Sequence, residues 1–297
     1  MTSLVVETMG FIGVGVMGEP MCRNLARKSG QPVLAFDQDP LPLARLATDG
    51  VQTAASVADL MQACSVVFLS LPSGEAVDAL ARAPDGLLAH LHAGQCIIDL
   101  GTSAVHTTRA LAQACAARGV TWVDAPVART RAAAESGTLA IMVGATLEAF
   151  TKVRALLATF ATDITHCGPV GCGQVVKILN NMVLFETVAA LAEAQAIGAS
   201  AGVDPALLFD ALSKGSADSF ALRNHGMKAI LPGEFPERAF SVRYAQKDLG
   251  YALQMAAQAG IAAAGANQVD ALFMRAVEAG LGDRYHPVIS QLHGNES

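Results

Sequence analysis

Short apolar runs alternate with longer helical stretches through the first half of the chain. Most of these runs are continuous rather than alternating, which is typical of strands that are covered on both faces. The alternation predicts β-α-β units arranged around a parallel sheet. The predicted strands are residues 10–13, 32–36, 66–71, 96–100, 121–124, 139–143 and 163–166.

Local signals place several helix ends in this half. Pro20 falls in the first turn of the first predicted helix, and Gly30 follows its last residues. Ser56, with Asp59 three residues later, resembles a capping box that opens a third helix.

The character of the chain changes after His166. A cluster of Gly168, Pro169, Gly171 and Gly173 is typical of a hinge, and the chain beyond it shows almost no strand pattern. Helices are predicted over residues 174–201, 204–212, 242–259 and 266–279. The predicted fold is α/β: a doubly wound, Rossmann-type domain over residues 1–168, and an all-helical domain over 169–297 joined to it by a long interdomain helix.

Length and composition fit this division and narrow the class of protein. At roughly 150 residues per domain, 297 residues predict two domains. The chain is 52% hydrophobic and 15% charged, so a disordered protein is excluded, and no apolar run reaches the roughly 18 residues of a membrane helix. The net charge of −6 offers no basic surface for nucleic acid or anionic lipid. We therefore expect a globular protein with neither partner.

The sequence shows neither a secretory signal nor a metal-binding pattern. The chain has Glu7 and no Lys or Arg before Arg23, so it lacks the basic start of a secretory signal, and we expect a cytoplasmic protein. Its six cysteines form no C-x-x-C pair, and His90 and His92 point in different directions on a helix. We therefore expect no metal site.

A glycine motif follows the first predicted strand. Gly13, Gly15 and Gly18 form G-x-G-x-x-G between a strand and a helix. The first glycine allows a tight turn, the second lets the backbone approach a pyrophosphate, and the third permits close packing of helix and strand. The free N–H groups at the start of the helix suit the bound anion. The motif therefore predicts a dinucleotide site that includes Val16 and Met17.

The second predicted strand ends at Asp37, nineteen residues beyond the last glycine. A carboxylate at this point accepts hydrogen bonds from the adenosine ribose and repels a 2′-phosphate. No Lys or Arg follows among Gln38, Asp39 and Pro40, so NAD is favoured over NADP. The alternative is that Asp37 only caps the next helix, for which Asp39 is the better candidate.

Loops at the carboxyl ends of later strands are predicted to border the nicotinamide. Leu71 ends the strand at 66–71 and Pro72 follows it, and Thr102 comes after the strand at 96–100. Open sheets of this class bind ligands at these ends. Each loop taken alone could equally be an ordinary turn that caps a helix.

The long helix after the hinge is apolar in nearly every direction except one. Gln174, Lys177 and Asn181 recur at i, i+3 and i+7 and form a polar stripe that needs a polar neighbour. A lysine among Val and Ile is costly unless it is paired or solvated. The stripe predicts that Lys177 is a general acid/base and that Asn181 orients the same substrate. The alternative is a lysine that extends along the helix to the surface.

Four segments resemble the β-hydroxyacid dehydrogenases, the 3-hydroxyisobutyrate dehydrogenase family. They are G-F-I-G-V-G-V-M-G-E-P-M at 10–21, D-A-P-V at 124–127 with G-T-L at 137–139 and M-V-G at 142–144, G-x-G-x-x-x-K-x-x-N-N at 171–181, and K-D-L at 247–249. The resemblance implies an NAD-dependent oxidoreductase that interconverts a small anionic 3-hydroxy acid and its semialdehyde. It also implies a homodimer or homotetramer formed through the helical domain.

The resemblance assigns roles to individual residues. It implies a catalytic lysine at Lys177 and substrate contacts from Asn180 and Asn181. Cofactor contacts are implied for Val16, Met17, Asp37, Leu71, Thr102 and Lys247.

The substrate segment departs from the family pattern. Ala128, Arg129 and Thr130 replace the usual Ser-Gly-Gly, so a guanidinium could pair with a substrate oxyanion. The Arg-Thr pair resembles the sulfolactaldehyde reductase branch, which binds a sulfonate. The alternative is that Arg129 is a surface residue of a loop that also holds Arg131 and Glu135.

Two other functions remain open at this point. One keeps the mechanism but runs it as reduction of an aldehyde such as tartronate semialdehyde or sulfolactaldehyde. The other is an NAD(P)-binding module without catalysis, which the presence of Lys177 argues against.

Overall fold

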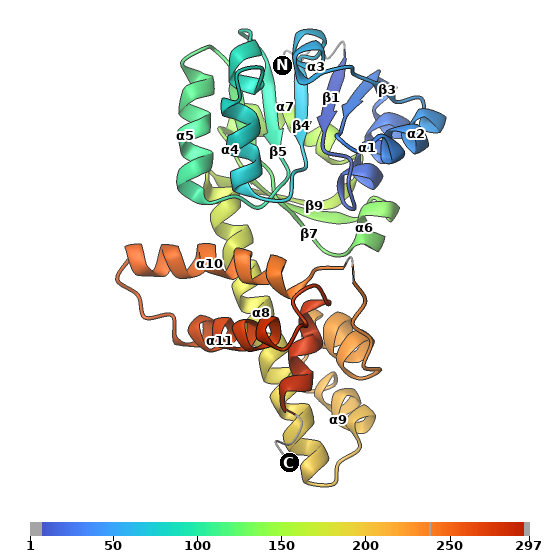
Figure 1. Ribbon diagram of the computed structural model, residues 1–297, viewed down its shortest axis with the longest axis vertical. Helices are drawn as coiled ribbons and strands as arrows, with labels where there is room; N and C mark the ends of the chain where they lie inside the picture. Colours follow the sequence, from blue (N-terminus) through green and yellow to red (C-terminus); the bar gives the residue numbers. More distant parts are fainter. Residues whose placement is uncertain (1–7, 238, 294–297) are drawn as a thin grey trace. The chain divides into compact units, whose positions relative to one another are not determined.

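The computed structural model describes residues 8–237 and 239–293, and the chain divides into two units, Met1–Lys177 and Ile178–Ser297. Glu7, which entered the expectation about the compartment, lies outside the described residues. Unit 1 holds all the named strands of the described chain, and unit 2 is helical apart from two isolated β-bridges. The α/β class with a helical C-terminal part is thereby confirmed (Figure 1).

Unit 1 alternates strands and helices along the chain. Its strands are β1 (Met9–Ile12), β2 (Val33–Phe36), β3 (Gln52–Thr53), β4 (Val66–Leu69), β5 (Cys96–Asp99), β6 (Thr121–Asp124), β7 (Val127–Ala128), β8 (Leu139–Gly144) and β9 (Ala161–Gly168). Its helices are α1 (Gly18–Ser29), α2 (Pro40–Leu46), α3 (Val57–Ala63), α4 (Gly74–Arg82), α5 (Val105–Ala116), α6 (Arg131–Ser136) and α7 (Leu147–Leu157), with short 3-10 turns at Ala47–Asp49 and Leu87–His90. All seven predicted strands are present, and the prediction missed β3 and β7, which have two residues each.

The strands form one sheet in the order β3-β2-β1-β4-β5-β6-β8-β7, with β9 beside β8. From β3 to β6 every pair is parallel, and the order reverses between β1 and β4, where a doubly wound sheet opens its ligand crevice. The predicted parallel arrangement holds from β3 to β6, whereas β8 runs antiparallel to β6 and β7. Only the short helix α6 separates β7 from β8, and this connection returns the chain in the opposite direction.

Alternate residues of the strands feed two separate cores. Phe11 and Phe68 pack with α1, α2 and α7 on one face of the sheet. Ile12 and Leu69, their neighbours in sequence, pack with α3, α4 and α5 on the other face. Burial on both faces explains why the strands read as continuous apolar runs.

The predicted helix signals act as expected. Asp39 accepts a hydrogen bond from Leu41 N and caps α2, and Ser56 accepts from Asp59 N and caps α3. Gly30 ends α1 with a φ of 72°, a left-handed conformation that glycine adopts without strain.

Unit 2 is built around the long helix α8, which begins in unit 1. Its helices are α8 (Cys172–Ser200), α9 (Pro205–Leu212), a π-helix (Leu222–Ile230), α10 (Val242–Gln258), α11 (Ala264–Glu278) and a 3-10 helix (His286–His293). Phe185 of α8, Leu249 of α10 and Phe273 of α11 are buried together in its core. The prediction located the four α-helices and missed the π-helix and the final 3-10 helix.

By length and composition alone, α8 could cross a membrane: it has 29 residues and a mean hydropathy of 1.5 over its most apolar window. However, 44% of that window is buried inside the protein, and the core helix of a soluble protein passes the same test. Its polar residues Gln174, Lys177 and Asn181 are also buried. We therefore interpret α8 as a core helix.

The core of unit 2 contains two buried imidazoles. His286 packs edge-on against Phe185 and Tyr285, and neither of its ring nitrogens has a hydrogen-bond partner among the described residues. Burial lowers the pKa of His286 well below its usual value and lowers that of His225 to about 4. His225 Nδ1 lies 2.5 Å from Tyr285 Oη.

Both histidines make the fold sensitive to acid. An unfolded histidine takes up a proton below about pH 6.5, which the folded chain resists, so stability falls as pH falls from about 6.5 toward 4. We expect His286→Leu to reduce this loss by about 1 to 2 kcal/mol at about pH 5. Urea unfolding followed by circular dichroism, near neutrality and near pH 5, measures the difference. An equal acid loss in both proteins would contradict it, since the other titrations are common to both.

Candidate active site

The glycine motif forms a tight loop between β1 and α1. Gly13 has a φ of 87°, and a Cβ at this position would lie 2.4 Å from the carbonyl oxygen of Ser70. A Cβ at Gly18 would lie 2.0 Å from the carbonyl oxygen of Gly13. At Gly15 a Cβ would meet nothing within 4 Å. Gly13 and Gly18 therefore close the loop, and Gly15 leaves open space beside its own backbone.

Asp37 braces this loop from the end of β2. Its Oδ2 accepts a hydrogen bond of 2.6 Å from Val14 N, and its Oδ1 accepts one of 2.9 Å from Asp39 N. A carboxylate has lone pairs for further bonds, so these contacts orient it and leave capacity for a ribose hydroxyl.

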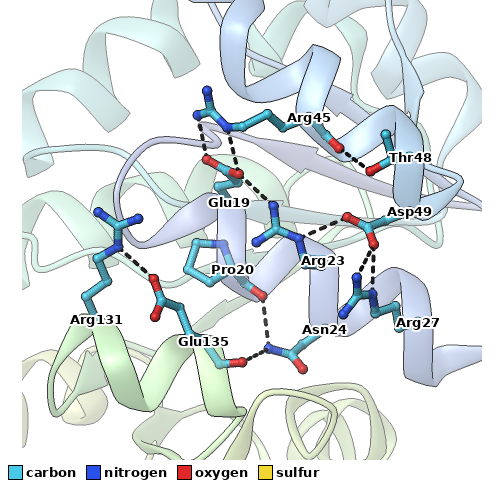
Figure 2. Close-up of polar contacts among 10 residues, drawn as sticks. All are labelled: Glu19, Pro20, Arg23, Asn24, Arg27, Arg45, Thr48, Asp49, Arg131 and Glu135. Carbon is cyan, nitrogen blue, oxygen red and sulfur yellow. Dashed lines mark hydrogen bonds and ion pairs between the residues drawn. The ribbon is translucent and has the colours of Figure 1, made fainter.

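Cations near this edge of the sheet are held in an ion-pair network (Figure 2). Glu19 at the start of α1 pairs with Arg45 at 2.7 Å and with Arg23 at 2.7 Å. Asp49 pairs with Arg23 at 2.9 Å and with Arg27 at 2.6 Å. Arg45, the arginine of α2, therefore already has an acidic partner.

The loops after β4 and β5 touch each other. A Cβ at Gly101 would lie 3.2 Å from the carbonyl oxygen of Leu71, and one at Gly74 would lie 3.1 Å from Ser103 Cα. Thr102 is buried between Gly101 and Ser103, whereas Pro72 is exposed. The structure thus brings the two loops together at the carboxyl edge of the sheet, and Ser73 also caps α4.

Asp99, at the end of β5, organises its own loop. Its Oδ1 accepts a hydrogen bond of 2.9 Å from Gly101 N, and its Oδ2 accepts one of 3.2 Å from Ser103 Oγ. Asp99 is in register with Asp124, the last residue of β6, and both side chains are fully buried.

Asp124 caps the first turn of α8. Its two carboxylate oxygens accept hydrogen bonds from Gly171 N at 2.7 Å and Gln174 N at 2.9 Å. Burial raises the pKa of Asp124 to about 6, and the backbone donors oppose that rise. A Cβ at Gly173 would lie 2.5 Å from the carbonyl oxygen of Met142, so glycine allows this close approach.

Lys177 lies one turn beyond this capped start and is 8% exposed. Asn181, in the next turn of the same helix, is buried, and Asn180 is exposed. Asn181 Nδ2 donates a hydrogen bond of 2.7 Å to Asp248 Oδ2, and Asn180 Nδ2 donates one of 3.2 Å to Asn181 Oδ1. Residues four apart are neighbours on a helix surface, so Lys177 and Asn181 share one face of α8.

Lys247 lies on α10 among aromatic and acidic groups. Its Nζ is 4.2 Å from the ring centroid of Tyr244, 5.4 Å from that of Tyr251, and 3.0 Å from Asp248 Oδ1. The two tyrosines hold the cation by cation–π attraction. Sequence analysis quoted Asp248 only within the K-D-L motif and did not single out the two tyrosines, although their i−3 and i+4 spacing around Lys247 is a usable signal.

The substrate segment holds its arginine within the protein. Arg129 has a φ of 85°, and its guanidinium lies 2.7 Å from Asp163 Oδ2, 2.7 Å from the Thr138 carbonyl oxygen and 3.1 Å from Thr162 Oγ1. Thr130 caps α6, and Ala128 ends β7. The guanidinium is therefore bound to the edge strand β9. Within the described chain, no group of three His, Cys, Asp or Glu side chains could hold a metal ion.

Comparisons with known domain families agree with this geometry. Residues 8–168 match the family described as the NAD binding domain of 6-phosphogluconate dehydrogenase. Residues 171–292 match the one described as NAD-binding of NADP-dependent 3-hydroxyisobutyrate dehydrogenase. A nicotinamide dinucleotide site is thereby shown, without a choice between NAD and NADP.

Individual relatives cover most of the chain. 2-(Hydroxymethyl)glutarate dehydrogenase of Eubacterium barkeri is 37% identical over 83% of this chain and 81% of its own. 3-Hydroxyisobutyrate dehydrogenase of Pseudomonas aeruginosa is 38% identical over 82% of this chain and 84% of its own.

Solved structures extend the similarity to the fold. 3-Hydroxyisobutyrate dehydrogenase of Mycobacterium tuberculosis with L-serine gives a TM-score of 0.88 at 28% identity, covering 98% of this chain and 100% of that one. Psf3 in complex with NADP+ and 2-OPP gives 0.86 at 28% identity, covering 96% and 99%.

Proposed function

Because the chain belongs to the 3-hydroxyisobutyrate dehydrogenase family of NAD(P)-dependent oxidoreductases, we propose that Lys177 exchanges the hydroxyl proton of a small anionic 3-hydroxy acid. The observation that carries the proposal is the placement of Lys177. It is buried one turn beyond a helix start that Asp124 and Gln174 fix to the carboxyl ends of β5 and β6. These strand ends carry the loop of Thr102, where the nicotinamide is expected.

The reaction can be balanced with these groups. In oxidation, the substrate hydroxyl gives its proton to the neutral amine of Lys177. The carbon that bears this hydroxyl gives up a hydride and becomes the aldehyde carbon of a semialdehyde, and NAD(P)+ would supply the hydride acceptor when bound. In reduction, the ammonium of Lys177 donates the proton to the carbonyl oxygen. Asn181, whose amide is oriented by Asp248, contacts the substrate with Asn180.

We also propose separate roles for the two domains and for the residues that bind the cofactor. Residues 1–168 form the NAD-binding domain and 169–297 the helical domain for substrate and oligomer contacts. Gly13, Gly15, Val16, Met17 and Gly18 receive the pyrophosphate, supported by the open space at Gly15. Leu71, Pro72, Thr102 and Lys247 contact the nicotinamide half. We also propose a cytoplasmic protein, and a homodimer or homotetramer as the family resemblance implies.

We propose NAD as the cofactor, which is supported by the carboxylate of Asp37 beside the glycine loop and by the pairing of Arg45 with Glu19. We expect Asp37→Asn to narrow the NAD/NADP ratio of kcat/KM at least about 10-fold, by removing a charged hydrogen bond and the repulsion of a 2′-phosphate. Asparagine can still accept the bond from Val14 N.

Asp39→Asn is the matched control, since Asp39 caps α2 and is exposed. It should leave the ratio unchanged. Initial rates with NAD and with NADP give the ratio of kcat/KM for each variant. An unaltered ratio in Asp37→Asn would exclude the Asp37 carboxylate as the cause of a preference for NAD.

For the substrate, we propose that Ala128, Arg129 and Thr130 make contact through their backbone. This is supported by the engagement of the Arg129 guanidinium with Asp163 and by its left-handed φ. We expect Arg129→Gly to change kcat/KM less than about threefold for carboxylate-bearing and sulfonate-bearing hydroxy acids. Glycine is chosen because it tolerates this φ.

The experiment that tests the proposed function is a substrate panel in both directions. It compares 3-hydroxyisobutyrate, L-serine, sulfolactaldehyde and tartronate semialdehyde, each with native protein and Arg129→Gly. A loss above about 10-fold confined to sulfonates would instead assign the guanidinium to the substrate, in line with a charged hydrogen bond of about 1.5 to 3 kcal/mol. No turnover of any small hydroxy acid or aldehyde would contradict the proposed function.

A further inference from the structure

Gln174 links α8 directly to the loop that follows β5. Its Nε2 donates a hydrogen bond of 2.9 Å to the Gly101 carbonyl oxygen, and its Oε1 accepts one of 3.0 Å from Ser103 N. The two bonded residues, Gly101 and Ser103, directly precede and follow Thr102 in the sequence. Gln174 is fully buried, so water cannot replace either bond without opening the core.

The loop is held equally firmly from its other side. Asp99 accepts hydrogen bonds from Gly101 N and Ser103 Oγ. The segment from Gly101 to Ser103 is thus fixed between a strand end and a helix. If Gln174 moves, its hydrogen bonds to this loop are strained, because Asp99 holds the loop at the end of β5.

The backbone of Gln174 is anchored as well. Its N–H donates to Asp124 Oδ2, so one residue is tied to β6 by its backbone and to the β5 loop by its side chain. Lys177 follows three residues later, nearly one full turn along the same face. The position of the lysine relative to Thr102 therefore depends on the clamp formed by the Gln174 amide.

We propose that Gln174 is a positioning residue that sets Lys177 against the cofactor loop at Thr102. This inference rests on the proposed function of Lys177 and adds a requirement to it. The amine must be placed by a buried amide that touches the loop at Gly101 and Ser103, and a shift of about 1 Å at such a site can cost about 100-fold in rate.

Gln174→Met removes both side-chain bonds and keeps the length of the side chain. We expect kcat to fall about 10- to 100-fold, with the dissociation constant of NADH changing less than about threefold. The pH limb of kcat should also shift by about half a unit, because the lysine enters a different environment. A merely structural residue would not move this limb.

Asn24→Leu is the matched control within unit 1. Asn24 is also a buried amide, and its Nδ2 donates to the carbonyl oxygens of Pro20 at 3.0 Å and Glu135 at 3.3 Å (Figure 2). It also donates to the Ala134 carbonyl oxygen at 2.9 Å. Its loss unlinks α1 from α6 without touching α8. We expect a comparable fall in Tm, kcat within about twofold of native, and an unmoved pH limb.

Gln174→Glu is the second variant, for the case in which methionine prevents folding. The carboxylate can still accept from Ser103 N but repels the Gly101 carbonyl oxygen, so kcat should again fall about 10-fold. Native kcat in the folded variant, or losses no greater than in Asn24→Leu with an unmoved pH limb, would overturn the inference. Lys177→Ala, assayed alongside, separates the two failures: full turnover in that variant overturns the proposed function itself.

Discussion

Lys177→Ala is expected to lower kcat at least about 100-fold while NADH still binds, because the variant loses the group that exchanges the hydroxyl proton. Because Lys177 is buried, exposed side chains and bulk water cannot readily replace its amine. Steady-state kinetics gives kcat, and quenching or enhancement of NADH fluorescence gives the dissociation constant. We expect a large change in kcat and a small change in the dissociation constant of NADH.

Lys152→Ala is a suitable control for this experiment. Lys152 pairs with Glu148 at 2.6 Å on α7, and both side chains are exposed. Its removal should leave kcat within about twofold of native, since exposed ion pairs contribute little. If Lys177→Ala kept kcat within the same range, Lys177 would be excluded as the general acid/base.

The second large effect concerns two glycines of one motif that are required for different reasons. At Gly18 an added methyl would lie 2.0 Å from a backbone oxygen, so we expect Gly18→Ala to lower the free energy of unfolding by about 3 kcal/mol. At Gly15 the methyl enters open space, so stability should change less than about 0.5 kcal/mol. The same methyl lies where a pyrophosphate approaches, and we expect the dissociation constant of NADH to rise at least about 10-fold.

Denaturant unfolding and NADH titration of both variants test this contrast. The decisive variant is Gly15→Ala, because its affinity loss cannot be attributed to misfolding. Native affinity for NADH in folded Gly15→Ala would contradict the placement of the pyrophosphate on this loop.

Much of the fold could be predicted because its signals are local. Burial on both faces produces continuous apolar runs, and these located the seven longer strands of the sheet. Ser56 and Asp39 form caps from contacts two or three residues away, which a sequence shows directly. The direction of β8 could not be predicted in this way, because an apolar run reads the same in both directions.

The candidate site was predictable only in part. The glycine motif and the polar stripe of α8 are periodic or contiguous in sequence, and both are visible without coordinates. The hydrogen bond from Gln174 N to Asp124 spans 50 positions, and the bond from Asn181 to Asp248 spans 67. No local pattern encodes such pairs. The sequence does show that Asp99 and Asp124 each end an apolar run, which predicts that both lie at the carboxyl edge of the sheet.

Arg129 shows the limit most clearly. Its chemistry predicts an anionic partner, and within the protein the guanidinium pairs with Asp163, 34 positions away. A guanidinium in a sequence pattern predicts the type of partner and not which partner it meets.

The distance from the Lys177 amine to the substrate hydroxyl decides whether Lys177 is the general acid/base. A crystal structure of the protein with NAD and a bound 3-hydroxy acid would measure how far Lys177 Nζ lies from the substrate hydroxyl oxygen. We predict about 2.6 to 3.2 Å, the reach of a direct proton transfer. A separation beyond about 5 Å with no bridging water, in a complex competent for turnover, would contradict the account.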